Sequence, residues 1–148
     1  MPLHSGRNTS EHLQLRPNQS LHFELGRAIV AQCGSLITRV LYVKQTDTKQ
    51  FAIVDAGMTE LIRPALYQAK HKIVNLTSRL DIQEKYDVVG PICESSDVFD
   101  KDLVLPVTQR GDVLAIRSAG AYGESMASTY NCRSLPKSFT DKEVEISI

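Results

Sequence analysis

The sequence has no excess of charge of either sign. Lysine and arginine together number 17, as do aspartate and glutamate, so the formal net charge at pH 7 is zero. Nucleic acids and anionic membranes favour a basic binding surface. The balanced composition therefore argues against either of them as the main partner.

Long apolar runs are also absent. No run approaches the roughly 20 apolar residues that a helix needs to cross a bilayer. The first 20 residues are polar and lack the apolar centre of a secretory signal peptide. These two absences predict a cytoplasmic protein without a membrane segment.

Cysteine is scarce and widely spaced, at Cys33, Cys93 and Cys132. No CxxC pair occurs and the histidines are scattered, so neither a zinc site nor a disulfide framework is indicated. Free thiols suit a reducing compartment. Without other information, each free cysteine is expected to be a small buried residue.

The 148-residue chain is long enough for one domain with a core of its own. Residues 1–20 show little apolar periodicity, and we expect a disordered leader there, native or artificial in origin. The pattern changes at Leu21, so the domain is predicted to cover residues 21–148.

Runs of β-branched residues between turn residues predict most of the strands. Apolar and polar residues alternate over residues 21–25. Residues 27–45 have the character of a long extended segment with a bulge or bend at Gly34. A turn at residues 46–50 joins this segment to a strand at residues 51–57 as a hairpin. Further strands are expected at 71–77, 86–93, 112–122 (after a turn at 109–112) and 143–148.

Only one helix is predicted, over residues 59–70. Thr59 suits its N-cap, Glu60 its first turn and Pro64 a position near its start. Many strands and one short helix predict a mainly β fold, a barrel or a sandwich.

The segment FELGR places Gly26 between Glu24 and Arg27. A glycine at this position can bring backbone amides close to an anion, and an arginine can clamp a carboxylate or phosphate with two hydrogen bonds. A turn with a surface ion pair between Glu24 and Arg27 is the alternative.

In the predicted helix, Arg63 and Tyr67 are four residues apart and therefore share one face. Pro64 restricts the backbone of the preceding arginine and disfavours its α-region. A guanidinium and a phenol held together suit a substrate carboxylate. A solvated arginine beside an ordinary packed tyrosine is the alternative.

The segment GPICESSD places a thiol, Cys93, beside a carboxylate, Glu94. A neighbouring carboxylate favours the protonated thiol, which suits a proton donor better than a nucleophile. The alternative is that Cys93 is a small buried hydrophobic residue.

The loop AGAYGES carries one aromatic residue, Tyr122, close to Gly120 and Gly123. Such a tyrosine can donate a hydrogen bond to a phosphate or cover a ring. The alternative is a β-bulge with a packed tyrosine.

These motifs occur in one chain and in a fixed order: FELGRAIVAQCGSLITRV, VDAGMTELIRPALY, YDVVGPICESSD and GDVLAIRSAGAYGESMASTYN. Together they resemble the C-terminal half of the diaminopimelate decarboxylase family, pyridoxal-phosphate (PLP) enzymes of the alanine-racemase-like fold type. The resemblance runs from about Leu21 to the end. Family members have a PLP-binding (β/α)₈ barrel followed by a β-barrel domain, and this chain is similar only to the second.

For the cofactor, the resemblance implies that Glu24, Gly26 and Arg27 lie near the PLP phosphate, and that Arg27 also reaches the substrate. The family has proline where this chain has Leu25. Proline fixes its backbone angle, so Leu25 is expected to loosen this loop.

For the substrate, the resemblance implies that Arg63 and Tyr67 bind it and that Tyr122 touches both substrate and cofactor. Cys93 corresponds to the catalytic proton donor. Glu94 corresponds to the residue that recognises the distal amino-acid end of the substrate. In such enzymes this cysteine and glutamate enter the active site of the partner subunit of a homodimer.

The implied activity is the PLP-dependent conversion of meso-2,6-diaminopimelate to L-lysine and carbon dioxide, the last step of lysine biosynthesis. The family carries the Schiff-base lysine on the (β/α)₈ domain, so this chain alone is expected neither to bind PLP nor to be active. Two alternatives stay open. One is a related PLP decarboxylase for ornithine, arginine or carboxynorspermidine. The other is a non-catalytic β-barrel interaction module.

Overall fold

A computed structural model of the chain describes residues 16–140. Most of the predicted leader and the alternating residues 143–148 lie outside this range. No helix within residues 16–140 has the length and apolarity needed to cross a membrane.

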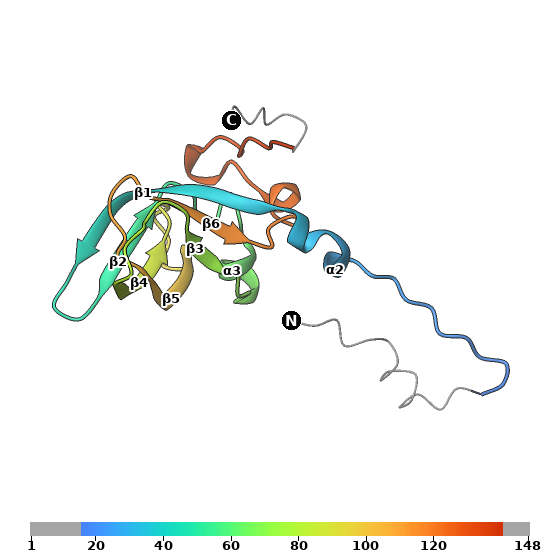
Figure 1. Cartoon of the computed structure of the whole chain (residues 1–148). Coiled ribbons are helices and arrows are strands. Elements are labelled where there is room, and N and C mark those ends of the chain that lie inside the picture. The colour runs from blue at the N-terminus through green and yellow to red at the C-terminus, as the bar shows by residue number, and fades with distance from the viewer. Residues whose placement is uncertain (1–15, 141–148) are drawn as a thin grey trace.

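Six strands form one sheet that curls into a nearly closed barrel (Figure 1). In chain order these are β1 (Ser35–Gln45), β2 (Gln50–Val54), β3 (Ile73–Asn75), β4 (Gln83–Val89), β5 (Val98–Pro106) and β6 (Val113–Arg117). Their order in the sheet is β3-β6-β1-β2-β4-β5. The pair β2–β4 is parallel and the other pairs are antiparallel. The predicted mainly β barrel is confirmed.

Side chains close the barrel where its two edge strands approach. The amide of Asn75, at the end of β3, donates to the hydroxyl of Thr108 at 3.1 Å. The hydroxyl of Ser78 donates to the carbonyl of Val107 at 2.8 Å. Both acceptors directly follow β5, so these bonds connect the two edges.

The core fills the barrel with inward-facing residues from all six strands. In β2, Ala52 and Val54 are fully buried, and their neighbours in the strand are partly exposed. Burying one large apolar side chain contributes about 1.5–3 kcal/mol. The buried cluster comprises Val40, Ala52, Val54, Ala56, Leu61, Ile73, Tyr86, Val88, Phe99, Leu105, Leu114 and Ile116.

The hairpin between β1 and β2 forms as predicted, with the Thr46 amide donating to the Lys49 carbonyl at 2.8 Å. The strands expected around residues 71–77, 86–93 and 112–122 correspond to β3, β4 and β6. The turn at 109–112 is also present, and Gly111 adopts a φ of 94° there. Strand β5 was not predicted, because its sequence VFDKDLVLP carries three charged residues in its middle.

The long extended segment predicted over residues 27–45 is wrong in its first part. Residues before Gly34 form the short helix α2 (Arg27–Val30) and the 3₁₀ helix η1 (Ala31–Cys33). The Gly120 amide donates to the Ala31 carbonyl at 3.0 Å and the Ala119 amide to the Gly34 carbonyl at 2.9 Å. A methyl group on Gly120 would lie 2.3 Å from the Val30 carbonyl oxygen, so the two backbones touch directly. This tertiary contact overrides the β-branched character of the segment.

The predicted helix over residues 59–70 is also shorter than expected. Helix α3 covers Arg63–Tyr67, with Ile62 as its N-cap and Pro64 near its start. Thr59 caps no helix, because its hydroxyl donates to the Glu60 carboxylate at 2.8 Å. Glu60 in turn accepts the amide of Gly57 at 2.7 Å, which closes a turn ahead of the helix.

Four connections leave the barrel at one end, which we call the loop end. They are α2 with η1 before β1, residues 55–72 after β2, 90–97 after β4 and 118–123 after β6. The parallel pairing of β2 and β4 puts the connections that follow them on the same side. Figure 1 shows α2 and α3 at this end, and the β1–β2 hairpin at the opposite end, which we call the hairpin end.

Residues 124–140 follow the barrel as an irregular segment with two short 3₁₀ helices, η2 (Glu124–Met126) and η3 (Tyr130–Cys132). The Ser128 amide donates to the Thr59 carbonyl at 2.9 Å. Arg133 forms an ion pair with Glu60 at 3.1 Å. The segment is therefore fastened to the turn that precedes α3.

Candidate functional site

Arg63 lies between two aromatic rings at the loop end. Its guanidinium carbon is 5.3 Å from the ring centre of Tyr67 and 5.9 Å from that of Tyr122. Tyr67 comes from the same helix, one turn on, as the spacing predicted. Tyr122 comes from the 118–123 loop and holds a left-handed φ of 60°, which is unfavourable for a side chain of this size. The loop therefore maintains strain that keeps this ring beside the arginine.

The FELGR segment reaches the same place. A methyl group on Gly26 would lie 3.6 Å from the Tyr122 hydroxyl, so the start of α2 is adjacent to that tyrosine. Arg27 is half-buried, whereas Glu24 is exposed. Among the ion pairs of residues 16–140 none joins Glu24 to Arg27, so the ion-pair alternative is wrong.

Within residues 16–140, three buried side-chain nitrogen atoms have no hydrogen-bond partner: Nε of Arg27, Nε of Arg63 and Nε2 of His71. A buried polar atom without a partner costs about 1–3 kcal/mol. Arginine N–H groups can only donate, so the two guanidinium groups fit an acceptor such as a phosphate or a carboxylate. We call Arg27, Arg63, Tyr67, His71 and Tyr122 the arginine cluster.

His71 falls at the start of the strand predicted over residues 71–77, and no local pattern in the sequence marks it as a site residue. It is buried, and its Nδ1 lies 2.9 Å from the Arg117 carbonyl oxygen. Burial lowers the pKa of His71, and the positive charges of Arg27 and Arg63 lower it further, against the opposing effect of the Arg117 carbonyl. The imidazole is therefore neutral at pH 7.

The loop that carries Cys93 and Glu94 is organised by Asp97. This buried carboxylate accepts the amides of Met58 at 2.6 Å and Ile92 at 2.7 Å. Gly90 packs directly on it, since a methyl group there would lie 2.3 Å from a carboxylate oxygen. Burial raises the pKa of Asp97, although the two backbone hydrogen bonds oppose this shift. A single aspartate after a serine pair gives no signal of burial, so the sequence does not indicate this role of Asp97.

Glu94 is exposed and accepts a hydrogen bond from the hydroxyl of Tyr130 at 2.7 Å. This bond and the Glu94 charge raise the pKa of Tyr130. The two residues border a small depression of about 290 Å³, which we call the Glu94 pocket. Its lining residues are Met58, Thr59, Ile62, Glu94, Ser128 and Tyr130.

All three cysteines are exposed free thiols. The expectation that Cys33 and Cys132 are buried is therefore wrong, and so is the alternative of a buried Cys93. Cys33 lies in η1 and donates from its thiol to the Val30 carbonyl at 2.8 Å. The exposure of Cys93 leaves its thiol accessible to a second molecule or domain.

The predicted site residues thus form two groups. Arg63, Tyr67 and Tyr122 are in contact, with Gly26 beside them, whereas Glu94 is bonded to Tyr130. In the part of the chain that is described, no hydrogen bond or ring contact connects Cys93 or Glu94 to the arginine cluster. One chain segment nevertheless links the two groups. Ile62 lines the Glu94 pocket, and the next residue, Arg63, belongs to the arginine cluster.

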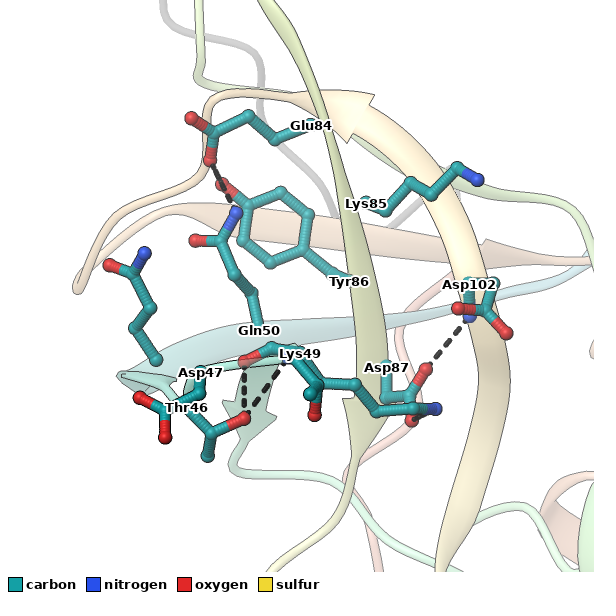
Figure 2. Close-up of a pocket in the computed structure, with 11 residues that line it drawn as sticks. Thr46, Asp47, Lys49, Gln50, Glu84, Lys85, Tyr86, Asp87 and Asp102 are labelled. Atoms are coloured by element: carbon teal, nitrogen blue, oxygen red, sulfur yellow. Dashed lines mark hydrogen bonds and ion pairs between the residues drawn. The ribbon is translucent and has the colours of Figure 1, made fainter.

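A larger depression, of about 360 Å³, lies at the hairpin end (Figure 2). Lys49 donates to Asp87 at 2.8 Å, and Glu84 accepts from Gln50 at 2.9 Å and from Tyr86 at 2.8 Å. The bonds from Lys49 and Gln50 connect the β1–β2 hairpin with β4, and the bond from Tyr86 lies within β4. Residues 16–140 contain no group of three His, Cys, Asp or Glu side chains placed to hold a metal ion.

Fold and site together define a β-barrel domain that presents unpaired arginine donors and an accessible thiol at one end. The family described as pyridoxal-dependent decarboxylase, C-terminal sheet domain, matches residues 28–120. The chain belongs to this family, and the resemblance found in the sequence is confirmed. The matched range includes Arg63, Tyr67, His71, Cys93 and Glu94.

The most similar relatives include diaminopimelate decarboxylases. That of Bacteroides thetaiotaomicron is 68% identical over 132 residues, which cover 89% of this chain and 34% of the relative. That of Vibrio cholerae is 51% identical over 83% of this chain and 29% of the relative. The chain therefore spans about a third of the length of these relatives.

Solved structures agree with this assignment. The diaminopimelate decarboxylase of M. jannaschii in complex with L-lysine superposes with a TM-score of 0.72 at 44% identity, over 75% of this chain and 25% of that one. The Helicobacter pylori enzyme complexed with L-lysine gives a TM-score of 0.67 at 56% identity, over 73% of this chain and 26% of that one. A lysine/ornithine decarboxylase from Vibrio vulnificus is only 22% identical and shares the fold alone.

Proposed function

We propose that this chain is the C-terminal domain of a diaminopimelate decarboxylase, which converts meso-2,6-diaminopimelate to L-lysine and carbon dioxide. The observation that carries the proposal is the arginine cluster, where Arg27 and Arg63 keep buried donors without an acceptor. The relatives named above support the choice of diaminopimelate over other amino-acid substrates.

The residues present fit PLP, whose phosphate would supply the missing acceptor. Arg27 would hold this phosphate, with Gly26 allowing close approach, Glu24 nearby and the Tyr122 hydroxyl beside it. When bound, PLP supplies the electron sink that makes loss of the carboxylate possible. The lysine that anchors it is proposed to lie on a separate (β/α)₈ domain.

Arg63 and Tyr67 are proposed to hold the carboxylate at the far end of the substrate, with Tyr122 covering the same group. Glu94 would accept hydrogen bonds from the distal ammonium, for which the Tyr130 hydroxyl keeps its carboxylate in place. A site that pairs both groups rejects substrates without them, because its own buried polar atoms stay unpaired. This accounts for selectivity against ornithine and arginine.

Cys93 is proposed as the proton donor. Loss of carbon dioxide breaks a C–C bond, and the carbon left behind must gain one proton to give L-lysine. The Sγ–H of Cys93 provides this proton and regains one from solvent. Within residues 16–140 no hydrogen bond or ring contact connects Cys93 to the arginine cluster, which supports a homodimer in which Cys93 and Glu94 act in the partner's active site.

The exposed apolar residues of the loop end support a covering domain. Phe23, Leu25 and Ile29 have exposed fractions of 58%, 63% and 66%, and Leu66 on α3 has 55%. Figure 1 shows the segment that carries Phe23 and Leu25 running away from the barrel. Exposed large apolar side chains are typical of an interface, and we propose that the (β/α)₈ domain covers these.

A chimaera tests the proposal. This chain replaces the corresponding segment of the Bacteroides thetaiotaomicron relative, and release of carbon dioxide and L-lysine from meso-diaminopimelate is measured. We expect activity with PLP, and a loss of about a hundredfold or more in kcat for Cys93→Ala. Cys33→Ala, another exposed thiol, is the matched control and should keep full activity.

Two outcomes contradict the proposal. A folded chimaera that binds PLP but prefers ornithine or arginine would refute the substrate. A Cys93→Ala chimaera with unchanged kcat would refute the proton donor.

A further inference from the structure

His71 occupies a fixed place between the end of β6 and the start of β3. It is 4% exposed, and its Nδ1 lies 2.9 Å from the carbonyl oxygen of Arg117, the last residue of β6. A carbonyl can only accept, so Nδ1 carries the hydrogen. In the neutral ring Nε2 then has a free lone pair, and this buried atom has no partner.

The charged groups that act on His71 are both cationic. They are Arg27 from α2 and Arg63 from α3, and no carboxylate acts on the ring. Each of these arginines also has a buried donor without an acceptor. Two of the three unsatisfied atoms are therefore donors that an acceptor such as an oxyanion would satisfy.

An anion bound to the arginines would make it easier for His71 to take up a proton. It would cancel the positive field that disfavours a charged ring, and it would add an attraction for a proton at Nε2. A protonated Nε2 can donate a hydrogen bond to the anion, so this atom would no longer lack a partner. Anion binding at the arginines would thus affect all three unsatisfied atoms.

We infer that His71 is a proton-dependent third donor of the arginine cluster, which takes up one proton from solvent at Nε2 when an oxyanion binds to Arg27 or Arg63. The inference rests on the proposed function of the cluster as an anion site. The oxyanion is a phosphate, which the proposed function assigns to Arg27, or a carboxylate, which it assigns to Arg63. Anion binding is therefore coupled to proton uptake.

A purely structural histidine needs only its Nδ1 hydrogen bond. Asparagine can supply the same donor, since its side-chain amide nitrogen occupies a position similar to that of Nδ1. His71→Asn is therefore expected to keep the bond to the Arg117 carbonyl while removing the group that titrates. It separates the proton-linked role from a role in holding β3 to β6.

The test uses the 148-residue chain labelled with ¹⁵N-histidine. Imidazole nitrogen shifts of His71 are followed against pH without anion, with sulfate and with acetate, at constant ionic strength in chloride. Sulfate represents a phosphate group and acetate a carboxylate, so the two arms distinguish the sources. The exposed His22 is the internal reference. Calorimetry with sulfate in two buffers of different ionisation enthalpy counts the protons taken up.

We expect the His71 midpoint to rise by about one pH unit or more with the effective anion. Where proton uptake is complete, affinity for the anion rises about tenfold for each unit that the pH falls. His71→Asn should bind sulfate without taking up protons.

An unchanged His71 midpoint with bound anion would overturn the inference and leave the arginine cluster intact as an anion site. A hydrogen on Nε2 rather than Nδ1 in the anion-free chain would overturn it as well, as would absence of anion binding. None of these results decides the decarboxylase activity, which the chimaera measures separately. The wild-type titration does not depend on whether His71→Asn folds.

Discussion

A single methyl group at Gly120 should disturb both the stability of the domain and its arginine cluster. A Cβ on this residue would lie 2.3 Å from the Val30 oxygen, 2.7 Å from the Gly34 nitrogen and 3.0 Å from the Cys33 sulfur. Two of these neighbours are backbone atoms, so no side-chain rotation relieves the contact. The segments must separate by roughly 1 Å to restore ordinary van der Waals distances.

The loss of stability has two parts, the overpacking itself and the loss of a backbone hydrogen bond. Overpacking of a well-packed region costs about 1–3 kcal/mol. The Gly120 amide also loses its 3.0 Å hydrogen bond to Ala31, a further ~1 kcal/mol. We therefore expect Gly120→Ala to lower the free energy of unfolding by about 2–4 kcal/mol. Arg27 lies on one of the two segments that meet at this contact, and Tyr122 lies on the other. Moving the segments apart therefore displaces the two residues from each other, so sulfate affinity should fall as well.

Urea unfolding of the 148-residue chain measures the first effect and calorimetry with sulfate the second. Gly111→Ala is the matched control. Gly111 has a φ of 94° and no atom within 4 Å of the place that a methyl group would take, so this variant loses about 1 kcal/mol from backbone strain alone. It lies at the hairpin end and should bind sulfate normally. Gly120→Ala with wild-type stability and wild-type sulfate affinity would refute the reasoning.

Three further substitutions test the two groups of residues. Arg63→Lys keeps the charge but loses the planar donor pair, so the KM of the chimaera for diaminopimelate should rise roughly 10- to 100-fold, in steady-state assays. Tyr130→Phe removes the hydrogen bond to Glu94, and KM should rise several-fold while kcat changes little; a loss confined to kcat would contradict a positioning role. Asp97→Asn can accept only one of the two amide hydrogen bonds and should cost about 1–3 kcal/mol in urea unfolding. Because the folded pKa of Asp97 is raised, protonation favours the folded wild type, so its advantage over Asp97→Asn should widen as the pH falls toward about 4. A constant difference would show that Asp97 does not titrate as described.

The sequence predicted those strands whose apolar residues alternate or form unbroken runs. β2, β4 and β6 have this character, and the polar residues before β2 predicted the hairpin turn. β5 lacks it, because Asp100, Lys101 and Asp102 interrupt its apolar residues. The strand forms nevertheless, since it pairs along the whole of β4.

Predictions failed where distant parts of the chain determine local structure. The residues of α2 and η1 are helical because the 118–120 backbone bonds to them, and no local pattern indicates that contact. Motifs located Arg63, Tyr67 and Tyr122, which the fold brings together. His71 and Asp97 were missed, because burial of a single polar residue depends on neighbours from other elements.

The parallel pairing of β2 and β4 has a consequence for how the domain folds. The strands are separated by residues 55–82, which include α3 and β3 and must close as a loop before the pair can form. Pairings between distant segments form slowly, because the entropy of loop closure is lost before the contacts are gained. The β1–β2 hairpin needs no such closure. We therefore expect the hairpin end to become ordered early, and Arg63, His71 and Cys93 to reach their native positions only in the final step. A covering domain would then meet its binding surface after the barrel has closed.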